Sequence, residues 1–201
     1  MRKQHPLLTP PEEAVLLHFI RSRWPHAYWP CAFMARLGLR LAESCVIRWT
    51  WINIAQAQRW YVTIPADAAK SATYRTLPLS LKLKLELEAH LQTRFPLWIA
   101  TDLPSEPLWP LNGGRTPSNR WVQRALQLAG QEVLKRHVHP HLLRHSFADR
   151  LLRHTNLPTV QKFLGHKWIQ STQKYTHPTL QDLTSALDKK DIAELPSDIL
   201  L

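Results

Sequence analysis

Four short stretches decide the fold. They are GLRLAE at residues 38–43, KSATYRTLPL at 70–79, HLLRH at 141–145 and LGHKW at 164–168, and Tyr175 follows nine positions after His166. Each stretch carries an arginine, a lysine or a histidine, and such cations bind phosphate groups. A tyrosine hydroxyl is a possible nucleophile when cations surround it. The set therefore indicates chemistry at a phosphate.

Together these stretches resemble the catalytic domain of the tyrosine recombinases, also called the phage integrase family. That family has a Gly-Leu-Arg-x-x-Glu box, a hairpin lysine, a His-x-Leu-Arg-His box, a Leu-Gly-His box and a nucleophilic tyrosine, in this order. One box could arise by chance, but four in register are specific. The resemblance covers about residues 8–183. It implies a mainly α fold with a small three-stranded antiparallel β-sheet (α+β).

The resemblance also implies roles for individual residues. Tyr175 is the expected nucleophile, and the two arginines are expected to act as a pair. Lys70 matches the hairpin lysine, although Ser71 stands where the family usually has glycine. Six residues are expected to be catalytic: Arg40, Lys70, His141, Arg144, His166 and Tyr175. Three are expected to support them: Glu43, which orients the arginine helix, His145 and Trp168.

Physical chemistry favours the same residue types. Attack on a DNA phosphodiester builds negative charge on two non-bridging oxygens, which two guanidiniums can bind without losing their own charge. A tyrosine hydroxyl ordinarily has a pKa of about 10, and a cationic cluster favours its reactive phenolate form. A lysine can protonate the leaving deoxyribose oxygen. The cations supply the electrostatic stabilisation, so no metal ion or other cofactor is expected.

Simpler explanations exist for each residue taken singly. His141 and His145 have the i,i+4 spacing of zinc ligands on a helix, but Leu142 stands where a metalloprotease has glutamate, and Arg144 would repel a cation. Tyr175 could be an interface aromatic, and Arg40 could simply pair with Glu43. The order and spacing of all six residues favour the recombinase interpretation over these alternatives.

The net charge points to a polyanionic partner. The 201 residues contain 26 Lys and Arg against 15 Asp and Glu, a formal net charge of +11. Eleven of those cations but only two acids lie between Trp109 and His177, and a solvated surface is the alternative explanation. We expect double-stranded DNA to be bound, mainly through its phosphates. The expected contacts are Arg115, Arg120, Arg124, Arg150, Arg153, Lys162 and Lys167.

Cysteines and apolar runs exclude other classes of protein. Only Cys31 and Cys45 are present, so neither a disulfide framework nor a cysteine zinc site is expected. No apolar run approaches the roughly 20 residues of a membrane span, and the N-terminus lacks a signal-peptide core. We expect a protein of the bacterial cytoplasm, associated with the nucleoid when bound to DNA.

Local signals predict mostly helices. Thr9 and Glu12 form a capping box before a helix over residues 10–23. The alternating LKLKLELE at 81–88 is typical of a strand, but Ser80 as N-cap and the helix-forming residues favour a helix. The five glycines are interpreted as helix stops or turns. Further helices are predicted at about 30–38, 41–45, 118–130, 140–154, 158–164, 170–175 and 180–190, and strands at 46–54, 59–64 and 75–79.

The domain organisation follows from the resemblance. Residues 1–183 are expected to form one catalytic domain, and residues 184–201 a C-terminal tail. The tail mixes acids with apolar residues and could fold back on its own domain or dock on a neighbouring protomer. No separate N-terminal core-binding domain is expected, as in short members such as the fimbrial-switch recombinases. A tetramer on DNA, helped by an accessory DNA-bending protein or a partner recombinase, is therefore expected.

The preferred function is site-specific recombination through a 3′-phosphotyrosine intermediate, in integration, excision or inversion of a mobile element. Two alternatives stay open. A type IB topoisomerase uses similar residues to relax supercoils without partners. A non-catalytic DNA-binding accessory protein could use the same scaffold.

Overall fold

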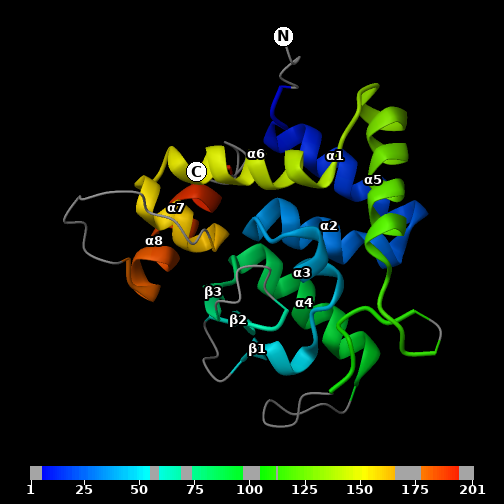
Figure 1. The fold of residues 1–201 in the computed structure, drawn as a ribbon, viewed down its shortest axis with the longest axis horizontal. Coiled ribbons are helices and arrows are strands. Elements are labelled where there is room, and N and C mark those ends of the chain that lie inside the picture. The colour runs from blue at the N-terminus through cyan, green and yellow to red at the C-terminus, as the bar shows by residue number, and fades with distance from the viewer. Residues whose placement is uncertain are drawn as a thin grey trace. The chain divides into compact units, whose positions relative to one another are not determined.

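The fold is mainly α with one small antiparallel sheet, as predicted. A computed structural model describes residues 6–54, 59–68, 74–96, 105–111, 113–165 and 178–194. The chain divides into two compact units, one of residues 1–45 and 109–150 and the other of residues 46–108 and 151–201. Figure 1 labels their elements. None of the described helices is long and apolar enough to cross a membrane.

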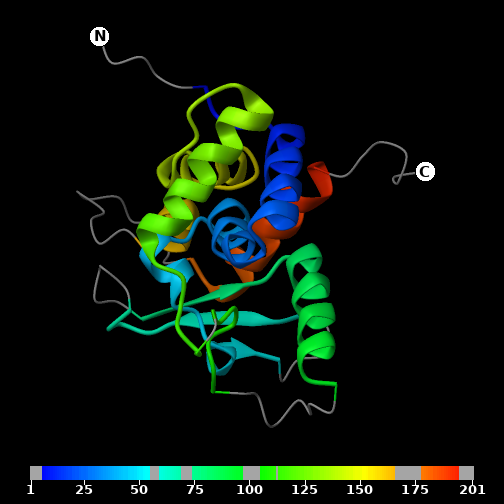
Figure 2. The same ribbon diagram turned by 90° about the vertical axis from the view of Figure 1, so that its right-hand side faces the viewer.

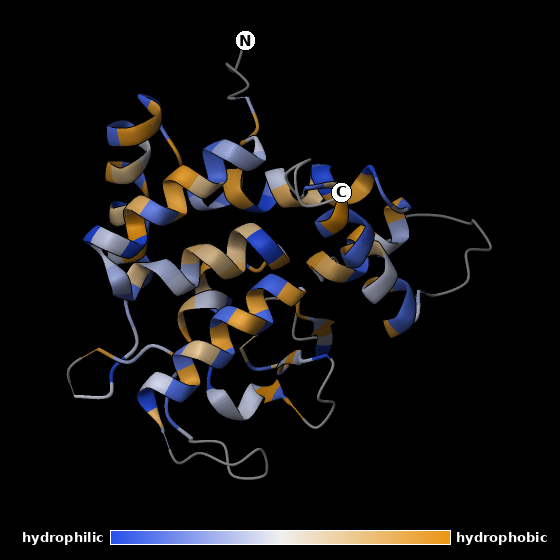
Figure 3. Cartoon of the chain, turned by 180° about the vertical axis from the view of Figure 1, so that it is seen from behind, coloured by the Kyte–Doolittle hydropathy of each residue, from blue (hydrophilic) through white to orange (hydrophobic). Residues whose placement is uncertain are grey.

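The first unit is helical. It contains α1 (Pro10–Arg23), α2 (Pro25–Leu37), α3 (Leu41–Cys45), α5 (Asn119–Leu134) and most of α6 (Pro140–Leu152). Helix α1 packs on α2 and α5, and α2 also packs on α3 and α5. Figure 3 shows hydrophobic residues recurring along the helices between hydrophilic ones, the pattern of helices with one buried side. The unit's interior includes Trp29 stacked on Trp109, with ring centroids 6.1 Å apart.

The second unit contains the sheet. Strands β1 (Ile52–Asn53), β2 (Tyr61–Ile64) and β3 (Arg75–Pro78) form an antiparallel sheet in the order β1-β2-β3. Val62 pairs with Ile52 on one side and with Leu77 on the other. Figure 2 shows α4 (Leu81–Arg94) beside this sheet. The unit also holds the 3-10 helix η1 (Trp49–Trp51), α7 (Leu157–Leu164) and α8 (Leu180–Ala193), which packs on β3.

Capping residues set the helix boundaries that the sequence predicted best. Thr9 and Glu12 form the expected capping box of α1. The Oγ of Ser80 accepts from the Leu83 N–H at 3.2 Å, and LKLKLELE is a helix with Leu83, Leu87 and Leu91 buried. Thr179 and Asp182 form a second capping box at the start of α8. Each cap satisfies N–H groups that have no partner within the helix itself.

Three predicted boundaries were wrong. Helix α2 begins at Pro25 and passes through Pro30, because burial of the neighbouring Tyr28 and Trp29 offsets the lost hydrogen bond. Within residues 46–54 only Ile52–Asn53 form a strand, and Trp49–Trp51 form η1, in which Trp49 packs against His90 and Phe95. Helix α5 continues through Gly130, where a Cβ would lie 2.5 Å from Val138 Cγ2. That glycine permits close packing and does not end the helix.

Candidate functional site in the arginine boxes

Arg40 is held by Glu43 at the start of α3. The Nη1 of Arg40 lies 3.0 Å from Glu43 Oε1, and the Arg40 backbone N–H donates to Glu43 Oε2 at 2.8 Å. The Glu43 side chain is 1% exposed, whereas that of Arg40 is 24% exposed. The buried carboxylate therefore fixes both backbone and side chain of a guanidinium that still reaches solvent. This is the Arg40–Glu43 pair that the simpler explanation of Arg40 also expects.

Arg144 lies on α6 and is buried. Its Nη1 donates to the backbone oxygen of Gly38. Gly38 ends α2 in the left-handed conformation, with φ of 63°, and stands two residues before Arg40. The Arg144 side chain is thus tied to the same loop that presents Arg40. The structure brings the arginines of two distant boxes to one loop.

The histidines of the HLLRH stretch lie along α6. His141 and His145 are both exposed, with ring centroids 6.2 Å apart. His137 and His139 continue the row, with successive centroids 5.6 and 6.5 Å apart. Among the described residues, no group of three or more His, Cys, Asp or Glu is arranged to hold a metal ion. The exposed imidazoles of His141 and His145 are accessible to a ligand.

Five of the predicted site residues lie outside the described residues. They are Lys70, His166, Lys167, Trp168 and Tyr175. The residue just before His166 is described. Gly165, which precedes His166, has φ of 64°, and a Cβ there would lie 2.9 Å from Arg75 Nη1. Both features require glycine at this position.

Arg75 is a residue whose position the sequence analysis did not anticipate. It opens β3, is 7% exposed and lies against Gly165. The side chain therefore connects β3, the strand within the KSATYRTLPL stretch, to the turn that precedes His166. The signal was present, because Arg75 is the arginine of the KSATYRTLPL stretch. The stretch alone did not predict that the Arg75 side chain packs against Gly165.

The predicted DNA contacts divide into exposed and buried residues. Lys162 is exposed and its Nζ donates to the backbone oxygen of Pro178, just beyond the Tyr175 segment. The other exposed residues are Arg115, Arg120, Arg124 and Arg153, of which Arg120 and Arg124 lie on α5. These arginines can reach a phosphate backbone.

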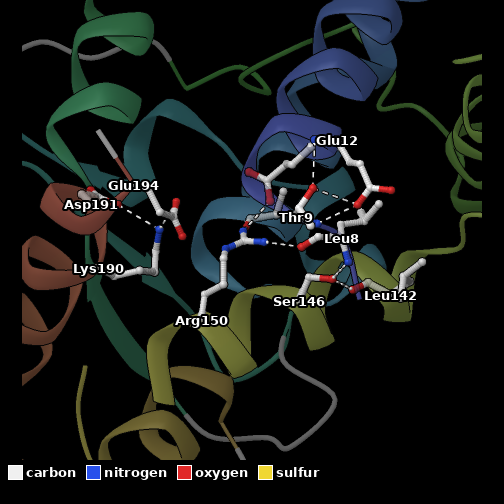
Figure 4. A network of polar contacts seen from close by, with 11 residues as sticks. Leu8, Thr9, Glu12, Leu142, Ser146, Arg150, Lys190, Asp191 and Glu194 are labelled. Atoms are coloured by element: carbon white, nitrogen blue, oxygen red, sulfur yellow. Dashed lines mark hydrogen bonds and ion pairs between the residues drawn. The ribbon is translucent and has the colours of Figure 1, made fainter. Parts of the chain in front are cut away.

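Arg150 differs from the other predicted DNA contacts in being buried. Its side chain is 9% exposed and forms an ion pair with Glu13, whose side chain is 11% exposed. It also donates to the backbone oxygen of Leu8 at 3.2 Å, and Leu8 N–H donates to Ser146 Oγ at 2.8 Å (Figure 4). Arg150 therefore fixes the segment before α1 onto α6. Its side chain is therefore engaged within the fold, whereas the five other described cations of the predicted set are exposed.

We expect Arg150→Met to lower the free energy of unfolding by about 3–5 kcal/mol, because the buried Glu13 carboxylate would lose the guanidinium of its ion pair. Urea titration of the two proteins measures this difference. Adding Glu13→Gln should recover part of the loss, because it removes that charge. A variant with unchanged stability but weaker DNA binding would restore Arg150 to the DNA-contact set.

The sequence matches a known protein family and several curated relatives. A family model described as "Phage integrase family" matches residues 8–182. A tyrosine recombinase XerC of Pseudomonas fluorescens is 34% identical over 152 residues, covering 75% of this chain and 48% of the relative. XerC of Xylella fastidiosa is also 34% identical, over 155 residues, with the same shares covered. The chain spans about half the length of the curated relatives it matches.

Solved structures share the fold. The crystal structure of XerA recombinase superposes with a TM-score of 0.63 at 22% identity, covering 96% of this chain and 67% of that one. XerH site-specific recombinase bound to its difH substrate gives 0.62 at 18% identity, covering 95% and 53%. The second neighbour was solved as a pre-cleavage complex with its substrate. At these identities the likeness shows a shared fold and nothing further.

Proposed function

The chain belongs to the phage integrase family, and we propose that it is a site-specific DNA recombinase that cleaves and rejoins strands through a 3′-phosphotyrosine intermediate. The tyrosine recombinase relatives and the DNA-bound structural neighbour support this proposal. The proposed substrate is double-stranded DNA. The exposed arginines of α5 would contact its phosphates.

The two arginines would stabilise the transition state. Each guanidinium can donate two parallel hydrogen bonds to phosphate oxygens, and neither loses its charge at neutral pH. Charge on the non-bridging oxygens grows during attack, so cations fixed beforehand stabilise the transition state more than the ground state. Glu43 and the Gly38 oxygen supply that fixation for Arg40 and Arg144, respectively.

The remaining residues would form and break the bonds to phosphorus and transfer the proton. The Tyr175 oxygen attacks phosphorus, the bond from phosphorus to the 5′ oxygen breaks, and Lys70 protonates the leaving oxygen. His141 and His166 would hold the phosphate. Attack of a 5′ hydroxyl on the phosphotyrosine reverses these steps and rejoins a strand. The energy of the broken phosphodiester is kept in the phosphotyrosine, so the proposal requires no nucleotide cofactor.

One observation carries the proposal furthest. Arg144 donates to the carbonyl of Gly38, in the loop that carries the Arg40–Glu43 pair. The two residues are far apart in the sequence, and this hydrogen bond brings both arginines to one loop. Such a pair matches the two non-bridging oxygens of a phosphodiester.

A nicked duplex tests the proposal. Cleavage opposite a nick near the scissile phosphate releases a short fragment that cannot religate, so a covalent protein–DNA adduct accumulates. We expect an adduct that survives denaturing electrophoresis and forms at one preferred sequence. Relaxation of supercoiled plasmid without sequence preference would favour the topoisomerase alternative, and absence of any adduct on bound DNA would favour the accessory protein.

We also propose that the C-terminal residues dock on a neighbouring protomer in a tetramer on DNA. Helix α8 ends at Ala193, and its Lys190 is buried and paired with Asp191 and Glu194 at 3.0 Å. The deletion that tests docking must therefore spare these residues and remove only residues 195–201. We expect the truncated protein to form the adduct but to lose at least about tenfold in strand exchange between two duplexes. Unchanged exchange would refute docking.

A further inference from the structure

The helix that carries His141 and Arg144 begins directly after a histidine. His139 precedes Pro140, the first residue of α6. The backbone N–H of Leu142 lies 3.2 Å from His139 Nδ1 and 2.9 Å from the His139 backbone oxygen. A backbone N–H can only donate, so Nδ1 is the acceptor and carries no proton in this arrangement.

This contact has the geometry of a helix N-cap. The first N–H groups of a helix have no partner within it, and an N-cap side chain accepts from the second or third of them. Pro140 has no N–H, and Leu142 is the third residue of α6. The imidazole of His139 thus occupies the place that Ser, Thr, Asp or Asn usually takes. The neutral ring accepts the hydrogen bond that a side-chain oxygen usually accepts at this position.

We propose that His139 is a positioning residue that caps α6 through Nδ1 and thereby holds His141 for the reaction. His141 is the second residue of α6, so it lies within the turn that the cap closes. Arg144 lies one turn further along and is also held by the Gly38 oxygen. Loss of the cap therefore affects His141 first. The catalytic consequence rests on the proposed function, while the capping itself does not.

The same inference accounts for the alternating histidines. His137, His139 and His141 have the spacing that invited a metal interpretation, and the ring centroids of the last two lie 6.5 Å apart. With Nδ1 of His139 accepting a backbone hydrogen bond, that nitrogen is committed to the helix. The row then has a structural member, His139, beside an exposed one, His141.

Three variants at one position test the proposal in the full chain. His139→Ala removes the acceptor, whereas His139→Asn and His139→Ser replace it with an oxygen. His137→Ala is the matched control, because it removes a neighbouring imidazole outside the helix. Hydrogen exchange at the Leu142 amide reports the cap directly. The initial rate of adduct formation at saturating nicked duplex reports its effect on the reaction.

We expect Leu142 to exchange about fivefold faster in His139→Ala, which corresponds to about 1 kcal/mol for the lost cap. Asn and Ser should restore slow exchange, and His137→Ala should stay within about twofold of the unchanged chain. Adduct formation should slow by about two- to fivefold in the Ala variant, with the half-saturating DNA concentration unchanged, and recover in Asn and Ser.

Two results would overturn the proposal. If Leu142 exchange is the same in His139→Ala, His139 is not a cap. If exchange is restored by Asn and Ser but adduct formation is not, the imidazole acts on DNA itself and the positioning role is wrong. If the unchanged chain forms no adduct, the proposed function fails, and the exchange measurement still decides whether His139 caps α6.

Discussion

Tyr175→Phe is expected to bind the nicked duplex and to form no covalent adduct. In the proposed mechanism the Tyr175 hydroxyl forms the bond to phosphorus, and the substitution removes this hydroxyl while it keeps the ring. Phosphate contacts supply most of the affinity for DNA, so binding should change little. Denaturing electrophoresis of the labelled duplex measures the adduct, and a mobility shift under native conditions measures binding.

Tyr74 provides the control for this experiment. Of the four tyrosines, Tyr28 is buried and Tyr61 is half-buried, whereas Tyr74 is 64% exposed. Hydrogen bonds from the hydroxyls of Thr76 and Thr63 lower the pKa of Tyr74, which makes it the chemical competitor among the described residues. Tyr74→Phe should nevertheless form the adduct normally. Loss of the adduct in Tyr74→Phe, with retention in Tyr175→Phe, would move the nucleophile to Tyr74.

The parts of the fold that the sequence predicted correctly depend on local chemistry. A capping box involves residues three positions apart, so Thr9 and Glu12 fixed the start of α1 without any long-range information. Ser80 separated helix from strand in a stretch whose alternation alone favoured a strand. The three-stranded antiparallel sheet was predicted correctly, because strands that follow one another in the sequence usually pair.

The parts that failed depend on contacts between distant residues. Gly130 permits the approach of Val138 at the end of α5, and no property of the glycine itself distinguishes that role from a helix stop. Residues 46–54 were predicted as a strand, yet the Ile47 oxygen accepts from Leu108 N–H at 2.9 Å, in a segment far along the chain. Local propensity cannot reveal such a partner.

In the candidate site, too, contacts between arginines and residues near them in the sequence were predictable, whereas contacts with distant residues were not. The Arg40–Glu43 pair was predictable, because residues three apart on a helix are neighbours. The burial of Arg150 was missed by counting charges. Periodicity would have found it, because Arg150 lies three residues after the buried Phe147 and seven after the buried Leu143, on one side of α6. The anchoring of Arg144 on Gly38 required the structure.

That anchoring yields a large expected effect for a conservative change. Arg144→Lys should lower the rate of adduct formation at saturating DNA by about 10²–10³-fold, the cost of removing one preorganised donor group from a transition state. A guanidinium has five N–H donors in one plane, so it can bind the Gly38 oxygen and still present others to a phosphate. A lysine ammonium is a single point that cannot occupy both places.

Single-turnover rates on the nicked duplex measure this loss, and thermal unfolding verifies that the Arg144→Lys variant is folded. Arg23→Lys is the matched control, because Arg23 is exposed at the end of α1 and has no proposed role. It should keep the unchanged rate. The half-saturating DNA concentration of Arg144→Lys should change far less than its rate, since the charge that attracts DNA is kept. If the two lysine variants cleave equally well, Arg144 does not bind the reacting phosphate, and its contact with Gly38 only joins α6 to the end of α2.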